Sequence, residues 1–264
     1  MILGIMQPYF FPYLGYFDLI NYADKWVVFD TAQYMRHGWV NRNRILHPAR
    51  GWQYIGVPVK HHAREAPISQ IEIAAAAKWR RRIPGQFAHY KSSAPNFDLV
   101  DGLLRDVFSF RWESLSRFNI FALRRCCHVL GIEFDYKVFS ELSLNLGPIE
   151  GPGDWALRIC EALGAEEYIN PPGGADLFDS AKFAAAGIKL TIQSYAPLVY
   201  DCGAFEFIPD LSILDVLLWN TPAHIMAHLN GPGLEIIRTV EPGSLTTGDI
   251  VRVPNCSSEG CLIF

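Results

Sequence analysis

Residues 2–30 read ILGIMQPYFFPYLGYFDLINYADKWVVFD, and this stretch decides the fold. Residues 2–7 are an apolar run that stops at Pro8, a pattern typical of a buried strand that opens into a loop. Residues 13–23 carry apolar side chains at helical spacing, and residues 25–30 are rich in the β-branched and aromatic residues that strands favour. A strand, a short helix and a second strand form a βαβ unit, and such units build parallel sheets.

The same patterns predict the elements that follow. Strands are expected at residues 52–59, 71–73, 167–170 and 188–195. Helices are expected at residues 76–92, 95–110, 114–130, 154–163, 181–186 and from Ser212 to about Trp219. Pro58 favours an edge or a terminus for its strand, and Gly131 and Gly164 are natural helix stops. The sequence therefore predicts an α/β fold with a mixed, mostly parallel sheet flanked by helices and a helical middle segment at about residues 76–130.

The chain length of 264 residues lies at the upper end of a single domain. We expect residues 1–230 to form one α/β domain, because Pro, Gly, Ser and Thr become frequent only from Gly231 onward. Residues 231–264 are then a C-terminal appendage, with a hairpin expected around residues 250–253.

Composition limits the classes of function. The chain is 50% hydrophobic and 19% charged, which argues against disorder over most of its length. Its 23 Lys and Arg against 27 Asp and Glu leave a formal charge of -4, which argues against a protein that wraps duplex nucleic acid but allows a local basic patch. We expect no membrane span and no export signal, and therefore a cytoplasmic location. The six cysteines and eight histidines show no framework or ligand spacing, so neither a disulfide nor a metal site is expected.

The first candidate site surrounds the loop after residues 2–7. Gln7 ends the expected strand, and residues 12–14 begin the expected helix, where free N–H groups and the helix dipole attract anions. Ligands of parallel sheets bind at such a mouth. The aromatic residues of the loop also fit an alternative role as a core plug between strand and helix.

The second candidate site contains Asp30 and Gln33, which follow the second strand, and the run from Trp39 to Arg44. Arg presents a planar fork that suits carboxylate or phosphate, and Asn supplies a paired donor and acceptor. We expect Arg42 or Arg44 to contact an anionic part of a substrate, and Gln7, Asp30 and Asn41 to share one pocket. A solvated loop, or one Arg acting as a structural tie, is the alternative.

The third candidate site is Lys60-His61-His62, at the end of the expected strand 52–59. A neutral His can accept a proton from an amine or hydroxyl near pH 7, so either His is a candidate base. Surface or packing histidines are the alternative. Cys126 and Cys127 lie within an amphipathic helix, where at least one is expected in the core rather than as a nucleophile.

Together these motifs resemble the WbqC-like family. The resemblance rests on Gln-Pro-x-x-Phe-Pro-Tyr-Leu-Gly-Tyr-Phe from Gln7, Phe-Asp-x-x-Gln from Phe29, and Trp-x-Asn-Arg-Asn-Arg-Ile from Trp39. It continues with Val-Pro-Val from Val57, the His pair, Tyr168 with Gly173 and Gly174, and Ser-Ile-Leu-Asp from Ser212, and it covers residues 1 to about 225. Met6 stands where the family more often has His, so a role for a histidine there is lost.

The resemblance implies a bacterial protein linked to O-antigen or other polysaccharide biosynthesis, and a transferase that moves a glycyl or other aminoacyl group onto an amino sugar. Catalytic candidates are then His61, His62, Asp30 and Gln7. Substrate-binding candidates are Gln33, Trp39, Asn41, Arg42, Asn43, Arg44, Tyr16, Gly173 and Gly174.

In this hypothesis an activated acyl group passes to an amine, on a small molecule or a nucleotide-linked sugar. Gln7, Asn41 and Asn43 would donate to the oxyanion, and Arg42 and Arg44 would hold phosphate. No tightly bound cofactor is expected, and the donor is left open between an acyl carrier protein thioester and an ATP-activated acid.

Two alternatives remain. Residues 2–30 are also similar to HIGH-type nucleotidyltransferases, in which the first helix start cradles phosphates, although the second His of that motif would align with Tyr16. This similarity favours a nucleotide-dependent ligase or nucleotidyltransferase. The third alternative is a non-catalytic module that binds a sugar nucleotide or a carrier protein.

Overall fold

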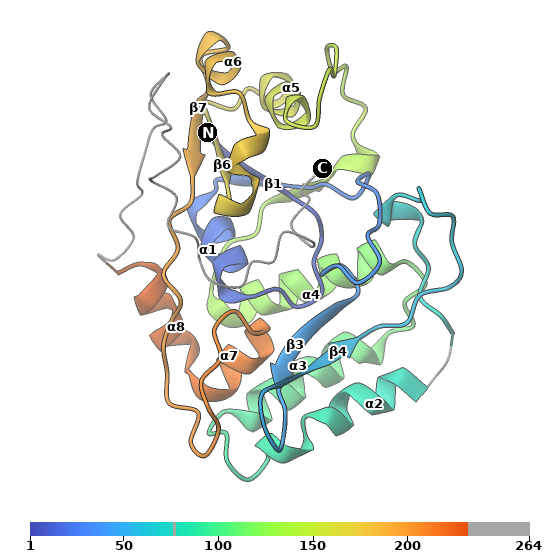
Figure 1. Cartoon of the computed structure of the whole chain (residues 1–264), viewed down its shortest axis with the longest axis vertical. Helices are drawn as coiled ribbons and strands as arrows, with labels where there is room; N and C mark the ends of the chain where they lie inside the picture. Colours follow the sequence, from blue (N-terminus) through green and yellow to red (C-terminus); the bar gives the residue numbers. More distant parts are fainter. Residues whose placement is uncertain (76–77, 232–264) are drawn as a thin grey trace.

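A computed structural model describes residues 1–75 and 78–231. Its centre is a sheet of five strands, β1 (Ile2–Met6), β2 (Lys25–Val28), β5 (Tyr136–Val138), β6 (Glu167–Asn170) and β7 (Lys189–Ile192). The strands lie in the order β5-β2-β1-β6-β7, and every neighbouring pair is parallel (Figure 1). The predicted α/β fold with a mainly parallel sheet is therefore confirmed.

Strand β1 is the middle strand, which explains its apolar sequence. Both faces of a central parallel strand are covered, so Leu3 and Ile5 are fully buried. Gly4 is required by close packing, because a Cβ at this position would lie 2.4 Å from the ring of Trp26 on β2. The βαβ unit of residues 2–30 forms as predicted, with helix α1 (Leu14–Tyr22) between the strands.

Helices cover both faces of the sheet. From β1 the chain moves to β2 in one direction, whereas from β5 to β6 and from β6 to β7 it moves in the other. Because such crossovers are right-handed, α1 lies on one face, and α5 (Asp154–Leu163) and α6 (Ser180–Ala185) lie on the opposite face (Figure 1). Gly164 ends α5 in the left-handed conformation that glycine favours, as the sequence predicted.

The predicted helical middle segment is also confirmed. It consists of α2 (Lys78–Gln86), α3 (Phe97–Ser109) and α4 (Leu115–Leu130). Ser114 caps α4 by accepting a hydrogen bond from the Arg117 N–H, and Gly131 ends it with a φ of 77°. The remaining elements are the short 3₁₀ helices Ile68–Gln70, Ala88–Tyr90, Phe139–Glu141 and Pro172–Leu177, and the helices α7 (Ile213–Trp219) and α8 (Pro222–Leu229).

The region of residues 41–59 differs from its prediction. No strand was predicted at residues 41–44, but Arg42–Leu46 form strand β3, which pairs antiparallel with β4 (Trp52–Gly56) in a separate two-stranded hairpin. The expected strand 52–59 therefore exists in part but lies outside the main sheet. Residues 71–73 make only isolated bridges to Val59 and Ser114. Strand β5 and helix α8 were not predicted, although Thr221 and Pro222 are standard helix-start residues.

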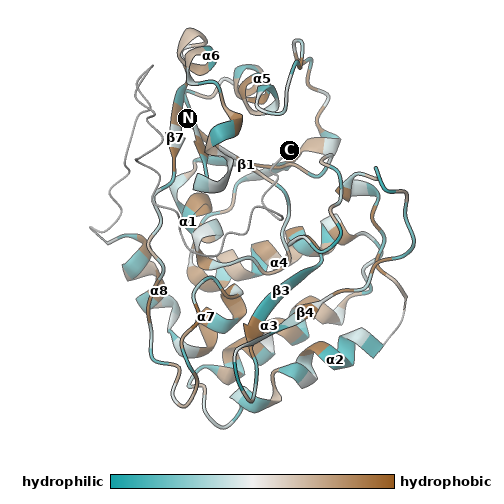
Figure 2. Cartoon of the chain, viewed as in Figure 1, coloured by the Kyte–Doolittle hydropathy of each residue, from teal (hydrophilic) through white to brown (hydrophobic). Residues whose placement is uncertain are grey.

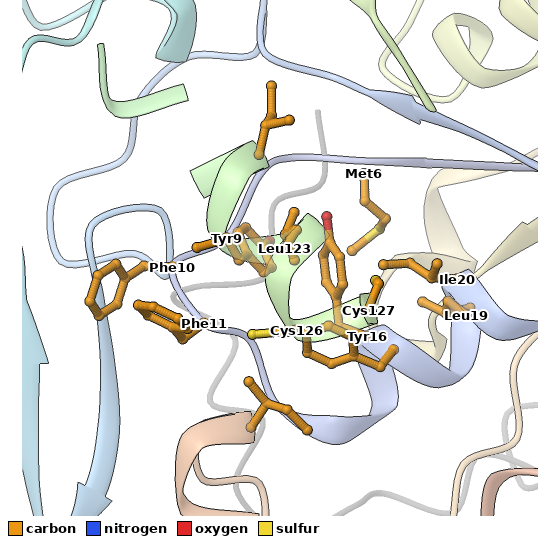
Figure 3. Close-up of a cluster of buried hydrophobic side chains, with 14 of the residues drawn as sticks. Met6, Tyr9, Phe10, Phe11, Tyr16, Leu19, Ile20, Leu123, Cys126 and Cys127 are labelled. Carbon is orange, nitrogen blue, oxygen red and sulfur yellow. The ribbon is translucent and has the colours of Figure 1, made fainter. Parts of the chain in front are cut away.

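The loop after β1 belongs to the core. Tyr9, Phe10 and Phe11 are buried and pack with Tyr16 and with residues of α4 such as Cys126 (Figure 3). The core plug considered for these aromatic residues is therefore the arrangement observed. The domain boundary near residue 230 stays a prediction, because the expected appendage and its hairpin at residues 250–253 lie outside the described residues. In the part of the chain described, no helix has the length and apolar character needed to cross a bilayer.

Candidate functional site

Polar side chains follow each strand of the parallel sheet at its carboxyl edge. They are Gln7 after β1, Asp30 after β2, Ser140 after β5, Asn170 at the end of β6 and Gln193 after β7. The connections leave β1 and β6 toward opposite faces, so a topological switch point lies between these two strands. In open α/β sheets, ligands bind in the crevice at such a point.

Asp30 is engaged within the protein. Its buried carboxylate accepts hydrogen bonds from the Ser140 N–H at 3.0 Å and the Ser140 hydroxyl at 2.8 Å, and from the Ser116 hydroxyl at 3.3 Å. These contacts join the ends of β2 and β5 to helix α4. In this structure Asp30 ties elements together.

Other side chains of this edge also face protein partners. The Tyr16 hydroxyl donates to the Gln7 carbonyl at 2.8 Å, and Tyr16 is fully buried. Burial raises the pKa of Tyr16 well above its ordinary value. Gln193 Nε2 donates to the Gly15 carbonyl at 2.9 Å and to Asp18, whereas the buried Gln193 Oε1 has no hydrogen-bond partner among the described residues.

The start of α1 is covered. Leu14 is buried, the Ile213 N–H donates to the Pro12 carbonyl at 2.8 Å, and Tyr13 forms an isolated bridge with Ser212. The Ser212 hydroxyl also donates to the Phe11 carbonyl at 2.8 Å. The expected anion site at residues 12–14 therefore has the start of α7 packed over it.

The β3–β4 hairpin presents a different kind of surface. The guanidinium of Arg42 lies 4.0 Å from the ring centre of Tyr54, and that of Arg44 lies 5.3 Å from the ring centres of both Trp39 and Trp52. Paired residues of antiparallel strands point to the same side, and the register pairs Arg44 with Tyr54. We call Trp39, Arg42, Arg44, Trp52 and Tyr54 the hairpin face.

The guanidinium groups of the hairpin face bond to backbone carbonyls and have no carboxylate partner among the described residues. Arg42 donates to the His37 carbonyl, and Arg44 Nη2 donates to the Asp210 carbonyl at 3.3 Å. The Nε atoms of both arginines have no hydrogen-bond partner among the described residues. No carboxylate in that part of the chain lies within ion-pair distance of either group.

Asn41 and Asn43, which lie in the same run of residues, stabilise the fold through hydrogen bonds to backbone carbonyls. Asn43 is buried, and its Nδ2 donates to the carbonyls of Phe10 at 3.2 Å and Phe11 at 2.8 Å. This holds Phe11 at a φ of 40°, an uncommon backbone conformation for a residue with a side chain. Asn41 Nδ2 donates to the Val57 carbonyl at 3.0 Å.

These bonds seat the hairpin against the loop after β1. Asn119 of α4 reinforces the contact, since its Nδ2 donates to the carbonyls of Pro8 and Val40, each at 2.7 Å. The hairpin therefore packs on the loop after β1, while Asp30 and Asn41 each contact protein groups. A shared pocket for Gln7, Asp30 and Asn41 stays a prediction.

The histidine pair lies in the loop after β4. His61 is exposed, and His62 packs its ring 4.9 Å from the ring of Tyr34, with Nδ1 2.8 Å from the Ala63 carbonyl. Gln33 is exposed and donates to the Arg64 carbonyl at 2.9 Å, so this loop packs beside residues 33–34.

A cavity of about 230 Å³ opens at the start of α5. Lys182 of α6 lies in its wall, 2.9 Å from Asp154 Oδ1 and 3.5 Å from Glu150. Gly174 is buried in the neighbouring 3₁₀ helix, whereas Gly173 is exposed. Gly173 and Gly174 follow β6, so they belong to the carboxyl edge of the sheet and not to the hairpin.

The described residues show no group of three His, Cys, Asp or Glu side chains that could hold a metal ion. Cys126, Cys127, Cys160 and Cys202 are buried and free. Burial raises the pKa of Cys127 to about 12, which disfavours the thiolate that a nucleophile needs.

Sequence reasoning assigned no site role to Trp52, Tyr54 or Asp215, although Asp215 belongs to the Ser-Ile-Leu-Asp motif. Trp52 and Tyr54 alternate along β4, a period-two signal that could have placed them on one face. Asp215 is fully buried beneath the hairpin and accepts hydrogen bonds from the Tyr90 hydroxyl, from the Leu46 N–H at 3.0 Å and from the Tyr200 hydroxyl at 3.3 Å. Burial raises the pKa of Asp215 to about 6, partly offset by these bonds.

The fold defines a doubly wound α/β protein with an arginine and aromatic hairpin that packs on the loop after β1. The chain belongs to the WbqC-like protein family, whose model matches residues 7–227. It is similar to the uncharacterized protein Rv1507c of Mycobacterium tuberculosis, with 30% identity over 241 residues, which cover 86% of this chain and 96% of the relative. No solved structure matches the chain.

Proposed function

We propose that the protein is an aminoacyl or acyl transferase that forms an amide on the amine of a phosphate-bearing substrate, such as a nucleotide-linked amino sugar. The arrangement of Arg42 and Arg44 carries this proposal. Both guanidinium groups are held against aromatic rings, and no carboxylate of the described residues pairs with either of them. Such a pair suits a bidentate phosphate contact.

The chemistry of amide formation assigns roles to the neighbouring residues. The amine nitrogen attacks the donor carbonyl, the carbonyl oxygen takes up negative charge, and the leaving group departs with its electron pair as the amine loses a proton. His61 or His62 would take that proton. Asn43 is an unsuitable oxyanion donor, because the carbonyls of Phe10 and Phe11 use its amide protons. Asn41 fits this role better, because the Val57 carbonyl uses only one of its two amide protons, and Gln7 stays a proposed donor.

The strand order favours a second candidate, a nucleotide-dependent ligase. The switch point between β1 and β6 is where doubly wound sheets bind nucleotides. The covered start of α1 argues against a phosphate cradle there. Release of pyrophosphate or phosphate from ATP in the presence of an acid and an amine would favour this candidate over a transferase with a preformed donor.

Substitution of each arginine by Lys tests the proposed phosphate contact. Lys keeps the charge but loses the planar fork, so Arg42→Lys and Arg44→Lys should weaken binding of UDP- or dTDP-linked amino sugars about ten- to a hundredfold in calorimetric titration. Melting temperatures should change little. Arg105→Lys is the control, because Arg105 lies on α3 and pairs with Asp101. If both variants bind every sugar nucleotide and ATP like the parent, the proposed phosphate site is wrong.

A further inference from the structure

Charge is distributed very unevenly along the chain. Residues 31–97 contain eleven Lys and Arg but only two acidic residues, Glu65 and Glu72, a formal charge of +9 in a chain of net -4. Five of the eight histidines also lie in this segment. A diphosphate carries about two negative charges at neutral pH, so a sugar nucleotide would neutralise only a small part of this excess. Such a cluster indicates a ligand with several phosphates.

The structure gathers part of this charge around the hairpin face. Arg82 of α2 donates to the Gly56 carbonyl at 3.0 Å, and Gly56 is the register partner of Arg42. Gln86 of the same helix donates to the Tyr54 carbonyl at 3.0 Å. Figure 2 shows hydrophilic residues along the first part of β3 and along much of α2. Arg36 and Arg50, before and after β3, are exposed.

Aromatic rings lie within the same surface. Trp52 is 41% exposed and Tyr54 is 40% exposed, and their ring centres lie 4.8 Å apart with an interplanar angle of 72°. Arg42 and Arg44 continue the row of flat groups, because each contacts one of these rings. Half-exposed rings and flat guanidinium groups are the surfaces on which unpaired bases stack.

From these observations we infer that the hairpin face, with Arg36, Arg50 and Arg82, binds a single-stranded nucleic acid. The bases stack on Trp52 and Tyr54, and the arginines contact the backbone phosphates. A duplex would keep its bases stacked inside, so it could not use the rings. An acidic protein would match the charge but would not need two half-exposed rings next to guanidinium groups. This inference does not depend on the proposed transferase activity.

Fluorescence anisotropy with fluorescein-labelled 12-nucleotide oligo-U and oligo-dT tests the inference. Binding to the full chain should be in the micromolar range at 50 mM salt. If about four phosphates are contacted, raising the salt to 200 mM should weaken binding about 50-fold. Trp52→Ala and Tyr54→Ala should each weaken it about five- to a hundredfold. Phe110→Ala is the matched control, because Phe110 is an exposed aromatic residue at the end of α3.

Two further pairs of variants separate stacking from folding and charge. Trp52→Phe and Tyr54→Phe keep a ring, so they should restore most of the binding that the alanine variants lose. Arg36→Gln and Arg50→Gln should weaken binding, whereas Arg105→Gln should not. These two positions are outside the proposed sugar nucleotide contacts, so sugar nucleotide binding should stay unchanged and the two proposals can fail separately.

Three results would overturn the inference. One is no binding of either oligonucleotide at 0.1 mM protein in 50 mM salt. A second is equal binding by the alanine variants and the parent, which would show a general polyanion surface or a site for an acidic protein. The third is tighter binding of a blunt duplex of the same length than of the single strands.

Discussion

The carboxyl edge of the sheet and the hairpin face are both rich in polar residues, but they use them in opposite ways. At the sheet edge, Asp30 and Gln193 make buried hydrogen bonds to other parts of the chain. On the hairpin face, Arg42 and Arg44 have no carboxylate partner among the described residues and contact half-exposed rings. The difference teaches that a polar residue is informative about ligands only when the protein leaves it accessible and without a charged partner.

The largest expected effect is on stability at the sheet edge. Asp30→Ala removes an acceptor of three hydrogen bonds and leaves the Ser140 N–H without its partner, so it should lower the free energy of unfolding by about 3–4 kcal/mol. Urea denaturation measures this loss. Gln33→Ala is the control, since Gln33 is exposed, and it should cost less than about 1 kcal/mol. Equal losses for the two variants would contradict the structural role of Asp30.

The stability of the fold should depend on pH through Asp215, which lies beneath the hairpin. Burial raises the pKa of Asp215 to about 6, so between about pH 4 and pH 6 the folded protein holds a proton that the unfolded chain has lost. Stability therefore falls as the pH rises through this window, by about 2–3 kcal/mol from this group, and the loss is complete above the folded pKa.

The Asp215 effect is measured as a difference between two proteins. Urea denaturation at several pH values should show the parent losing stability relative to Asp215→Asn as the pH rises from 4 to 6. Other acids titrate in both proteins, so they cancel in the comparison. Parallel stability curves for the two proteins would show that Asp215 has an ordinary pKa.

Alanine substitution should destabilise the protein more at Asn43 than at Asn41. Asn43→Ala removes two buried hydrogen bonds to the loop after β1 and should cost about 2 kcal/mol of unfolding free energy. Asn41→Ala removes one half-buried bond to Val57 and should cost about 1 kcal/mol. Chemical denaturation of both variants makes the comparison. A larger loss at Asn41 would reverse the assignment of Asn43 as the residue that seats the hairpin.

The smallest effect on stability is expected on the hairpin face itself. Trp52→Phe changes a half-exposed ring, so it should alter the free energy of unfolding by less than about 0.5 kcal/mol. Thermal and urea denaturation should both detect no more than this. A loss above about 2 kcal/mol would show that the hairpin face is as structural as the sheet edge.

Much of the fold could be predicted from local patterns. The βαβ unit of residues 2–30 and the end of α4 at Gly131 are local features, and both appear as expected. Strand β3 could not be predicted in this way, because Arg42 and Arg44 are uncommon strand residues whose outward positions depend on rings supplied by Trp39 and β4. Strand β5 spans only Tyr136–Val138, too few residues for a periodic signal.

The candidate site was less predictable than the fold. The sequence placed Asp30, Asn43 and Tyr16 near a ligand edge, and the structure does place Asp30 and the residues around Gln7 at the carboxyl edge. The sequence could not show that Ser116 and Ser140, which lie far along the chain, donate hydrogen bonds to the Asp30 carboxylate. Hydrogen bonds between distant segments decide whether a polar group is free, and local composition does not record them.

The central position of β1 has a consequence for synthesis of the chain. This strand precedes the others, and one of its edges pairs with β2 soon afterward, but the other edge waits for Glu167–Asn170 of β6. At ribosomal speeds of about 5–20 residues per second, that edge stays open for on the order of ten seconds. An open apolar edge is available for pairing with other chains during this time. Slower translation between these two strands would lengthen the exposure and favour aggregation of the nascent protein.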